Sequence, residues 1–227
     1  MAASTVTTRW WWIRHAPVEN PERRLYGQQD LPCNCGETAV FQSLAKLLPD
    51  GAVWLTSHLQ RTRQTAEAVL PHFVTGDRTE PELLAEPAIA EQNFGTWQGM
   101  NFNQLKEHLG STFDEFWRNP AKARPPDGES FADVIARVAK TVNHLNNEHA
   151  GRDIVAFAHG GSIRAALAHA LAIDADSALS FRIDNCSLTR IDHVVVSDGS
   201  PAPGAARPWR VMLVNWLASA APMQGGN

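Results

Sequence analysis

Two stretches decide the fold: Arg9-Trp10-Trp11-Trp12-Ile13-Arg14-His15 (residues 9–15) and Ile154-Val155-Ala156-Phe157-Ala158-His159-Gly160-Gly161 (residues 154–161). Each contains a short apolar run closely followed by a histidine, which is typical of a buried strand that leads into a loop. In α/β proteins, ligands bind at the carboxyl ends of the strands, where residues distant in sequence meet. We therefore expect His15 and His159 to share one crevice at that edge of a sheet.

Apolar runs alternate with helical patterns along most of the chain, which predicts an α/β fold with a mainly parallel sheet. Towards its end, two strand patterns flank a Gly- and Pro-rich turn, residues 197–208, so an antiparallel hairpin is expected at a sheet edge. The predicted architecture is a three-layer α/β/α sandwich whose mixed sheet lies between two helix layers. The expected strands are 10–13, 53–56, 154–158, 181–183, 188–196 and 209–214, and the expected helices are 37–48, 61–70, 103–117, 131–149 and 163–171.

Two local patterns add detail to this prediction. Strand side chains alternate between faces, so Trp11 should oppose Trp10 and Trp12. Ser130, followed three residues later by Asp133, predicts a helix that begins with a capping box.

Length and composition fit a soluble globular protein of one large domain or two small ones. The 227 residues are 44% hydrophobic and 19% charged, and a formal net charge of −4 gives no support for binding to nucleic acid or a membrane surface. Cys33, Cys35 and Cys186 leave at least one thiol unpaired and lack zinc-site spacing. With no leader-like start and no run of about 18 apolar residues, the sequence predicts a cytoplasmic protein whose partner is a small molecule.

Arginines near the two strand ends point to phosphate chemistry. Alone, His15 is more simply explained as a core or surface residue, but Arg14 beside it offers a planar set of donors that suits phosphate oxygens. Arg61 is expected in the first turn of a helix, where backbone N–H groups favour anions and a cation opposes the helix dipole. A bound anion would offset that local cost, whereas Arg63 is expected to be solvated or ion-paired.

Five short motifs follow one another along the chain. They are Arg14-His15, Ser57-x-Leu59-x-Arg61-Thr62-x-Gln64-Thr65, Glu91-x-x-Phe94-Gly95-x-Trp97-x-Gly99, Gly128-Glu129-Ser130 and His159-Gly160-Gly161-x-Ile163-Arg164. This ordered series, over about residues 9–216, resembles the phosphoglycerate mutase-like branch of the histidine phosphatase superfamily, to which small enzymes such as α-ribazole phosphate phosphatase also belong. The resemblance implies one histidine phosphatase-like domain over residues 1–227, with a small helical cap inserted at about residues 92–128.

The resemblance also implies a role for each matching residue. The implied catalytic residues are His15, a nucleophile that becomes transiently phosphorylated, Glu91, a general acid, and His159. The implied phosphate-binding residues are Arg14, Arg61, His159, Gly160 and, more loosely, Asn20. No metal or cofactor is implied. Glu86 is the rival acid, and Glu91 is favoured by its spacing to Phe94-Gly95.

Elementary chemistry agrees with these roles. A neutral imidazole can attack phosphorus and split one difficult step into two. Guanidinium groups stabilise the charge on the equatorial oxygens of a loose phosphoryl-transfer transition state. A carboxylic acid can protonate the leaving alkoxide and later accept a proton from water.

The chain departs from the family pattern after the first histidine. Ala16 stands where the family usually has glycine, which would cost roughly 1 kcal/mol if that position needs a left-handed conformation. The loop that follows is about one residue shorter than usual before Gly27, so Asn20 only approximates the family's phosphate-binding asparagine.

Hydrolysis is favoured over mutase activity. Mutases of this branch carry a long basic insertion after the Glu-containing motif, whereas residues 101–127 here are short and hold four basic and four acidic residues. The aromatic residues of this region predict either packing beneath the cap or an apolar wall for the substrate: Phe94, Trp97, Phe102, Phe113, Phe116 and Trp117.

The sequence thus predicts a metal-independent phosphomonoesterase for a small-molecule phosphate. A phosphoglycerate mutase remains an alternative, as does a catalytically silent module that only binds a phosphate ligand, although His15, Glu91 and His159 are all present. An acyl hydrolase lacks its Gly-x-Ser-x-Gly nucleophile elbow. Both a monomer and a homodimer are compatible with the sequence.

Overall fold

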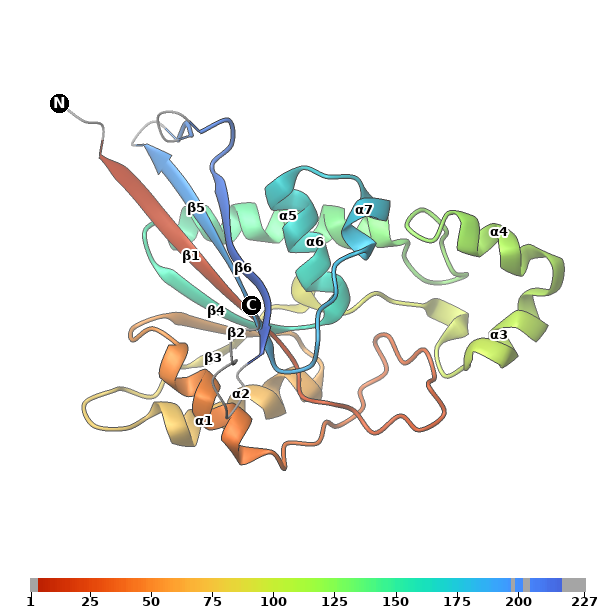
Figure 1. Ribbon diagram of the computed structural model, residues 1–227, viewed down its shortest axis with the longest axis horizontal. Helices are drawn as coiled ribbons and strands as arrows, with labels where there is room; N and C mark the ends of the chain where they lie inside the picture. Colours follow the sequence, from red (N-terminus) through yellow and green to blue (C-terminus); the bar gives the residue numbers. More distant parts are fainter. Residues whose placement is uncertain (1–3, 197–198, 202–204, 218–227) are drawn as a thin grey trace, which may run out of the picture.

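The computed structural model describes residues 4–196, 199–201 and 205–217. Its centre is a six-stranded sheet in the order β3-β2-β4-β1-β5-β6 (Figure 1). The first four strands in this order pair in parallel, and β5 and β6 pair antiparallel, so the predicted mixed sheet is confirmed. The strands are β1 (Thr5–Arg14), β2 (Val53–Thr56), β3 (Leu83–Ala85), β4 (Asp153–Ala158), β5 (Ser187–Val196) and β6 (Trp209–Leu217).

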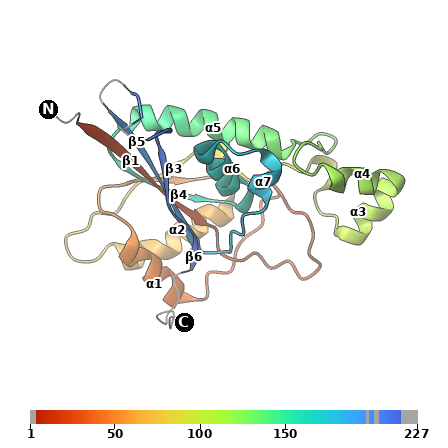
Figure 2. The same cartoon turned by 45° about the horizontal axis from the view of Figure 1, so that its top comes forward.

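Helices cover both faces of the sheet, which confirms the predicted α/β/α sandwich. Figures 1 and 2 place α1 and α2 on one side and α5, α6 and α7 on the other. Over the described residues the helices are α1 (Thr38–Leu47), α2 (Gln60–Phe73), α3 (Phe102–Leu109), α4 (Phe113–Arg118), α5 (Phe131–Glu148), α6 (Gly160–Leu171) and α7 (Ala175–Leu179), and the 3-10 helices are η1 (Pro87–Ile89), η2 (Gly95–Trp97) and η3 (Gly110–Thr112). None of these described helices is long and apolar enough to cross a membrane.

The tryptophans of β1 show how the two cores are divided. Trp10 and Trp12 are fully buried on the α5 and α6 side and stack with ring centroids 5.0 Å apart. Trp11 packs on the α1 and α2 side, as the alternation of strand side chains predicts. Burying these large rings on both faces removes extensive apolar area from water and fixes the register of β1.

The strand register places the two histidines side by side. Arg14 of β1 pairs with Ala158 of β4, so His15 and His159 each follow at the same level. The backbone N–H of His15 also donates to the carbonyl of Ala158, at 3.0 Å. The carboxyl ends of β1 and β4 thereby bring together residues that are far apart in sequence.

Residues 102–118 form an excursion to one side of the sheet (Figures 1 and 2). The single helix predicted over 103–117 is wrong, because Gly110 has a φ of +53° and separates α3 from η3 and α4. Trp97, Leu105 and Phe113 form a small buried core of their own. Backbone bonds from Leu25 to Gly99 and Met100 tie this excursion to the loop that follows His15.

The carboxyl-terminal half holds two confirmed predictions and one wrong one. α5 begins with the predicted capping box of Ser130 and Asp133, and β5 and β6 form the antiparallel hairpin. The strand predicted over 181–183 is absent from the structure, since these residues form an irregular segment whose carbonyls bind arginine side chains. Of the predicted turn 197–208, residues 197–198 and 202–204 lie outside the described residues.

Candidate active site

His15 lies just beyond β1, fully buried, with one ring nitrogen engaged and the other free. Its Nδ1 lies 2.7 Å from the carbonyl oxygen of Ala16 and therefore donates a proton to it. A neutral imidazole carries one N–H, so Nε2 keeps its lone pair, and no described residue hydrogen bonds to it. Burial and the charge of Arg61 lower the pKa of His15 to about 3, against an ordinary value of 6.5. The neutral ring thus presents an unpartnered nitrogen, Nε2, with a free lone pair.

Ala16 fits the nucleophile loop without strain. It is not among the described non-glycine residues of positive φ, so the left-handed conformation that would penalise alanine does not arise. Its side chain is fully buried, and its N–H donates to Thr65 Oγ1 at 2.8 Å. Substitution of the family's usual glycine therefore leaves the loop geometry intact.

Two arginines, Arg14 at the end of β1 and Arg61 in the first turn of α2, lie close to His15. Arg14 donates from Nη1 to the carbonyl of Ile183 at 2.6 Å, and its buried Nε finds no partner in the described parts of the chain. Arg61 is fully buried and donates to the carbonyls of Gly27 and Gln29, at 2.6 and 2.8 Å. These carbonyls already offset part of the cost of a cation at the start of α2, which the sequence assigned to a bound anion. Arg63 instead pairs with Glu67 on the surface, as predicted.

His159 is the fully buried cap of α6, with its ring centroid 5.2 Å from that of His15. Arg61 Nε donates to its Nδ1 at 3.3 Å, and Ser57 Oγ lies 2.8 Å from its Nε2. Burial, followed by the neighbouring His15 and Arg61, holds the pKa of His159 well below its usual range. Both histidines are therefore neutral in the unliganded protein.

Glu91 approaches the amino end of α6. Its Oε1 accepts from the N–H groups of Gly161 and Gln92, each at 3.0 Å, and no described residue engages Oε2. A Cβ on Gly161 would lie 2.1 Å from Oε1, so only glycine admits the carboxylate at this position. Glu86 caps η1 through Ala88 and does not share this placement.

The first turn of α6 adds an anion-binding element. Gly160 opens a 12-residue helix whose N–H groups and dipole favour negative charge. A Cβ built on Gly160 would lie 3.5 Å from Arg164 Nη1 and 3.6 Å from Arg14 Nε, so two guanidinium groups converge over this helix end. Arg164 belongs to a sequence motif, but no sequence pattern predicted that it lies beside Arg14.

The structure does not bring Asn20 to this cluster. Both polar groups of its side-chain amide bond the backbone of Arg24, at 2.8 Å each, and so organise a turn within the loop. Its assignment as a phosphate ligand finds no support in the geometry, because a loop one residue shorter closes on itself before it reaches His15.

Several supporting residues escaped the sequence analysis. Arg137 of α5 pairs with Glu129 at 2.7 Å and donates to the carbonyls of Ala88 and Ala90, which fixes the backbone that carries Glu91. Asn185 donates to the carbonyl of His15 at 2.7 Å. Arg137 and Asn185 stood in no motif, and nothing in their local pattern distinguishes them from surface polar residues.

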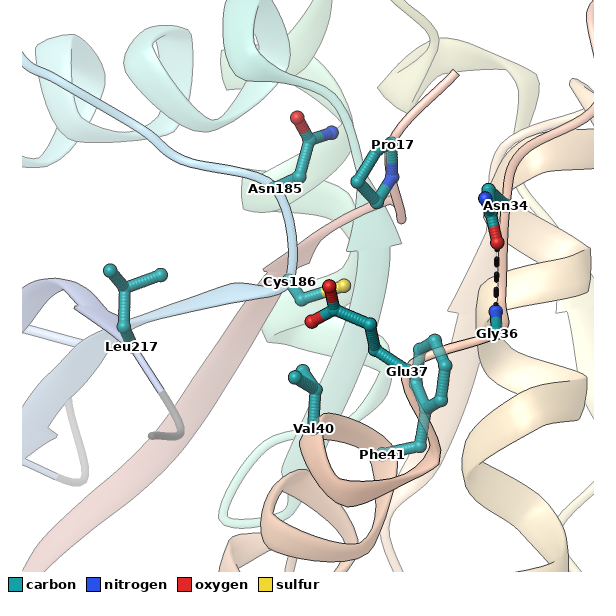
Figure 3. A pocket seen from close by; sticks show the side chains of 9 residues that line it. All are labelled: Pro17, Asn34, Gly36, Glu37, Val40, Phe41, Asn185, Cys186 and Leu217. Carbon is teal, nitrogen blue, oxygen red and sulfur yellow. Dashed lines mark hydrogen bonds between the residues drawn. The ribbon is translucent and has the colours of Figure 1, made fainter. Parts of the chain in front are cut away.

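A cavity of about 480 Å³ lies next to the nucleophile loop (Figure 3). Its largely apolar lining includes Pro17, Val40, Phe41 and Asn185. The side chains of the candidate site are absent from this lining: Arg14, His15, Arg61, Glu91 and His159. It is therefore a neighbour of the candidate active site rather than its substrate-binding part. Within the described chain, no group of three or more His, Cys, Asp or Glu side chains is placed to hold a metal ion.

Comparison with known proteins gives this cluster a context. Residues 10–195 match the model of the histidine phosphatase superfamily, branch 1. A 2,3-bisphosphoglycerate-dependent phosphoglycerate mutase of Bartonella henselae is 32% identical over 135 residues, which cover 57% of this chain and 64% of that protein, just under two thirds of its length. A second such mutase, of Gloeobacter violaceus, is 27% identical over a segment that covers 80% of this chain and 84% of that mutase.

Solved structures share the fold at lower identity. The α-ribazole phosphatase of Shigella flexneri superposes with a TM-score of 0.73 at 24% identity, over 91% of this chain and 96% of its own. A mycobacterial glucosyl-3-phosphoglycerate phosphatase superposes with a TM-score of 0.75 at 22% identity, over 92% of this chain and 99% of that phosphatase. With both mutases and phosphatases among its relatives, and with a family match over most of its length, the chain belongs to branch 1 of the histidine phosphatase superfamily, whose members transfer or hydrolyse phosphoryl groups.

Proposed function

We propose that this protein is a metal-independent phosphomonoesterase that works through a phosphohistidine on His15. The observation that carries the proposal is the free lone pair of His15 Nε2, on a ring held neutral beside the guanidinium groups of Arg14 and Arg61. A neutral nitrogen surrounded by cationic donors is suited to attack the phosphorus of a bound anionic ester.

The reaction has two steps. His15 Nε2 attacks phosphorus, the P–O bond to the alcohol breaks, and Glu91 gives a proton to the departing alkoxide. A water molecule then attacks the phosphohistidine while Glu91 takes up its proton, which releases inorganic phosphate and restores His15. The sum is ester plus water giving alcohol plus phosphate.

The protein supports these steps mainly by position and charge. Arg14 and Arg61 stabilise the equatorial oxygens, and the free Nε–H of Arg14 is available to one of them. The two backbone bonds to Glu91 Oε1 orient the carboxyl group, so that Oε2 is left for the leaving oxygen or for water.

The expected experiment is phosphate release from a panel of phosphomonoesters, with a chelator present, for wild type and His15→Ala. The panel includes α-ribazole phosphate and glucosyl-3-phosphoglycerate, which the names of the structural relatives suggest, alongside sugar phosphates. Turnover that persists with chelator and vanishes in the variant supports the proposal. Turnover that survives in His15→Ala contradicts the assignment of the nucleophile.

A mutase is the second candidate, because the relatives from Bartonella henselae and Gloeobacter violaceus carry that name. The short excursion between Gly99 and Gly128, with balanced charge, favours hydrolysis instead, since mutases of this branch carry a long basic insertion there. Interconversion of 2- and 3-phosphoglycerate that needs a bisphosphate primer and outpaces phosphate release would reverse this choice. If neither reaction occurs while inorganic phosphate still binds, the protein is a phosphate-binding module.

A further inference from the structure

A buried hydroxyl lies behind the phosphate-binding residues without a role in the proposed chemistry. Ser57 directly follows β2, is 2% exposed, and places its Oγ 2.8 Å from Nε2 of His159. Ser57 Oγ also lies within hydrogen-bonding distance of Thr62 Oγ1 and Leu59 N. The donor and acceptor types of these groups fix the direction of each hydrogen bond.

Arg61 decides which nitrogen of His159 carries the proton. A guanidinium N–H can only donate, and Arg61 Nε points at His159 Nδ1 from 3.3 Å. Nδ1 must therefore present its lone pair, and the single N–H of the neutral ring lies on Nε2. That N–H donates to Ser57 Oγ.

The remaining bonds of Ser57 agree with this direction. Thr62 Oγ1 gives its one proton to the carbonyl of Leu59, at 2.9 Å, so it is left as an acceptor for the hydroxyl proton of Ser57, at 3.2 Å. The N–H of Leu59 donates to Ser57 Oγ at 3.1 Å. Ser57 Oγ thus gives one proton and accepts two, which uses its full capacity.

We infer that Ser57 is a positioning residue: by accepting the Nε2 proton of His159, it holds that ring in the orientation in which the Nδ1 lone pair faces Arg61. The chain of contacts runs from Ser57 through His159 to the guanidinium of Arg61. This inference deepens the proposed function, on which its catalytic meaning rests, while the orientation of the ring is a property of the resting protein.

Loss of the hydroxyl has a definite consequence. In Ser57→Ala the buried Nε2–H has no acceptor, which is costly in an apolar interior. A proton on Nδ1 would meet the Nε–H of Arg61 head on, so the ring keeps its proton on Nε2 and relieves the cost by turning away from its wild-type orientation. Arg61 loses its side-chain acceptor, and its guanidinium is held by the carbonyls of Gly27 and Gln29 alone.

The test is the ¹⁵N NMR spectrum of the His159 ring in wild type, Ser57→Ala and Ser162→Ala. Ser162→Ala is the matched control, because Ser162 is a buried serine of α6 whose hydroxyl bonds only the backbone of His159, at 3.1 and 3.2 Å. Wild type and Ser162→Ala should both show a protonated Nε2 and an unprotonated Nδ1. Ser57→Ala should shift or broaden the signals of both ring nitrogens, because the hydrogen bonds to Ser57 and Arg61 are lost, and near-isosteric Ser57→Cys, a weak acceptor, should show an intermediate effect.

Binding of inorganic phosphate, followed by titration, provides the second readout. Ser57→Ala should weaken it about tenfold, as expected for one lost buried hydrogen bond, while Ser162→Ala lowers stability but not phosphate affinity. Signals of the ring nitrogens that are unchanged in both Ser57 variants, or a wild-type ring protonated on Nδ1, overturn the inference. These measurements need no turnover, so a protein whose His159 signals change as expected but that hydrolyses no ester would refute the proposed function and leave the role of Ser57 standing.

Discussion

At the level of single residues, the imidazole ring of His15 is neutral because of its surroundings. Burial and Arg61 lower the pKa of His15 to about 3, whereas the unfolded chain titrates near 6.5. The unfolded state therefore binds more protons between these values, and His15 makes the folded protein less stable as pH falls from 6.5 towards 3.

This pKa shift predicts a pH-dependent difference between wild type and His15→Gln. From pH 6 to pH 4.5, wild type should lose about 2 kcal/mol more of its free energy of unfolding than the variant, because the variant has no imidazole to protonate on unfolding. Urea unfolding at several pH values measures this difference. Parallel pH profiles for the two proteins would show that His15 titrates normally in the folded state.

Gly161 is the second residue whose chemistry fixes the site. Gly161→Ala should lower kcat/KM at least about tenfold, because the added Cβ would lie 2.1 Å from Glu91 Oε1 and displace the carboxylate. In a Glu91→Ala background the same substitution should cost little further activity, since there is no carboxylate left to displace. Two effects that simply multiply would mean that Gly161 acts independently of Glu91.

At the level of elements, helix α5 carries both a cap and a brace for the site. Ser130→Ala should destabilise the protein by about 1 kcal/mol, as the hydroxyl accepts from Asp133 N within a reciprocal capping box. Ser43→Ala is the matched control, because Ser43 is a half-buried serine inside α1 whose hydroxyl donates to the carbonyl of Ala39. Thermal or urea unfolding should show a loss for Ser130→Ala and little change for Ser43→Ala, and equal effects would argue against the cap.

Elements with a strong pattern were predictable, and those shaped by distant contacts were not. The runs around Trp12 and Phe157 are apolar enough to mark central strands, and the histidines after them predicted the crevice. β3 spans only Leu83–Ala85 and is half exposed, so no alternation reveals it. Gly110 ends α3 through a positive φ, a backbone choice that the surrounding helical pattern hid.

The same division holds within the candidate site. Residues in motifs, such as Arg61 and Glu91, were found because their type and spacing suit phosphate. Their supports were not, because the carbonyls of Gly27 and Gln29 act through the backbone, which any sequence supplies. Segment 181–183 looked like a strand for its apolar residues, but its carbonyls face Arg14 and Arg164 instead of a neighbouring strand.

At the level of the whole molecule, the edge hairpin is connected to the site by a chain of contacts. Asn215 of β6 accepts from Asp184 N at 2.6 Å and donates to its carboxylate at 2.9 Å, which steadies the segment that binds Arg14 and the carbonyl of His15. Because Asn215 has a φ of +55°, Asn215→Gly preserves the backbone while removing these bonds.

We therefore expect Asn215→Gly to lower kcat/KM several-fold while the protein stays folded. Met212→Thr serves as the control, since Met212 is 53% exposed on the same strand. Steady-state kinetics beside circular dichroism would separate the two effects. Equal activity in Asn215→Gly and wild type would show that the hairpin stabilises the sheet without influencing the site.

The position of β1 within the sheet has a consequence for how the protein folds during its synthesis. β1 is made first, yet its neighbours are β4, which begins at residue 153, and β5, which ends at Val196. A ribosome-bound chain must therefore grow as far as β4 before the strand that leads to His15 finds either partner. Such long-range pairing slows folding and leaves the three tryptophans of β1 exposed meanwhile, so the nascent protein depends on protection from aggregation until β4 has emerged.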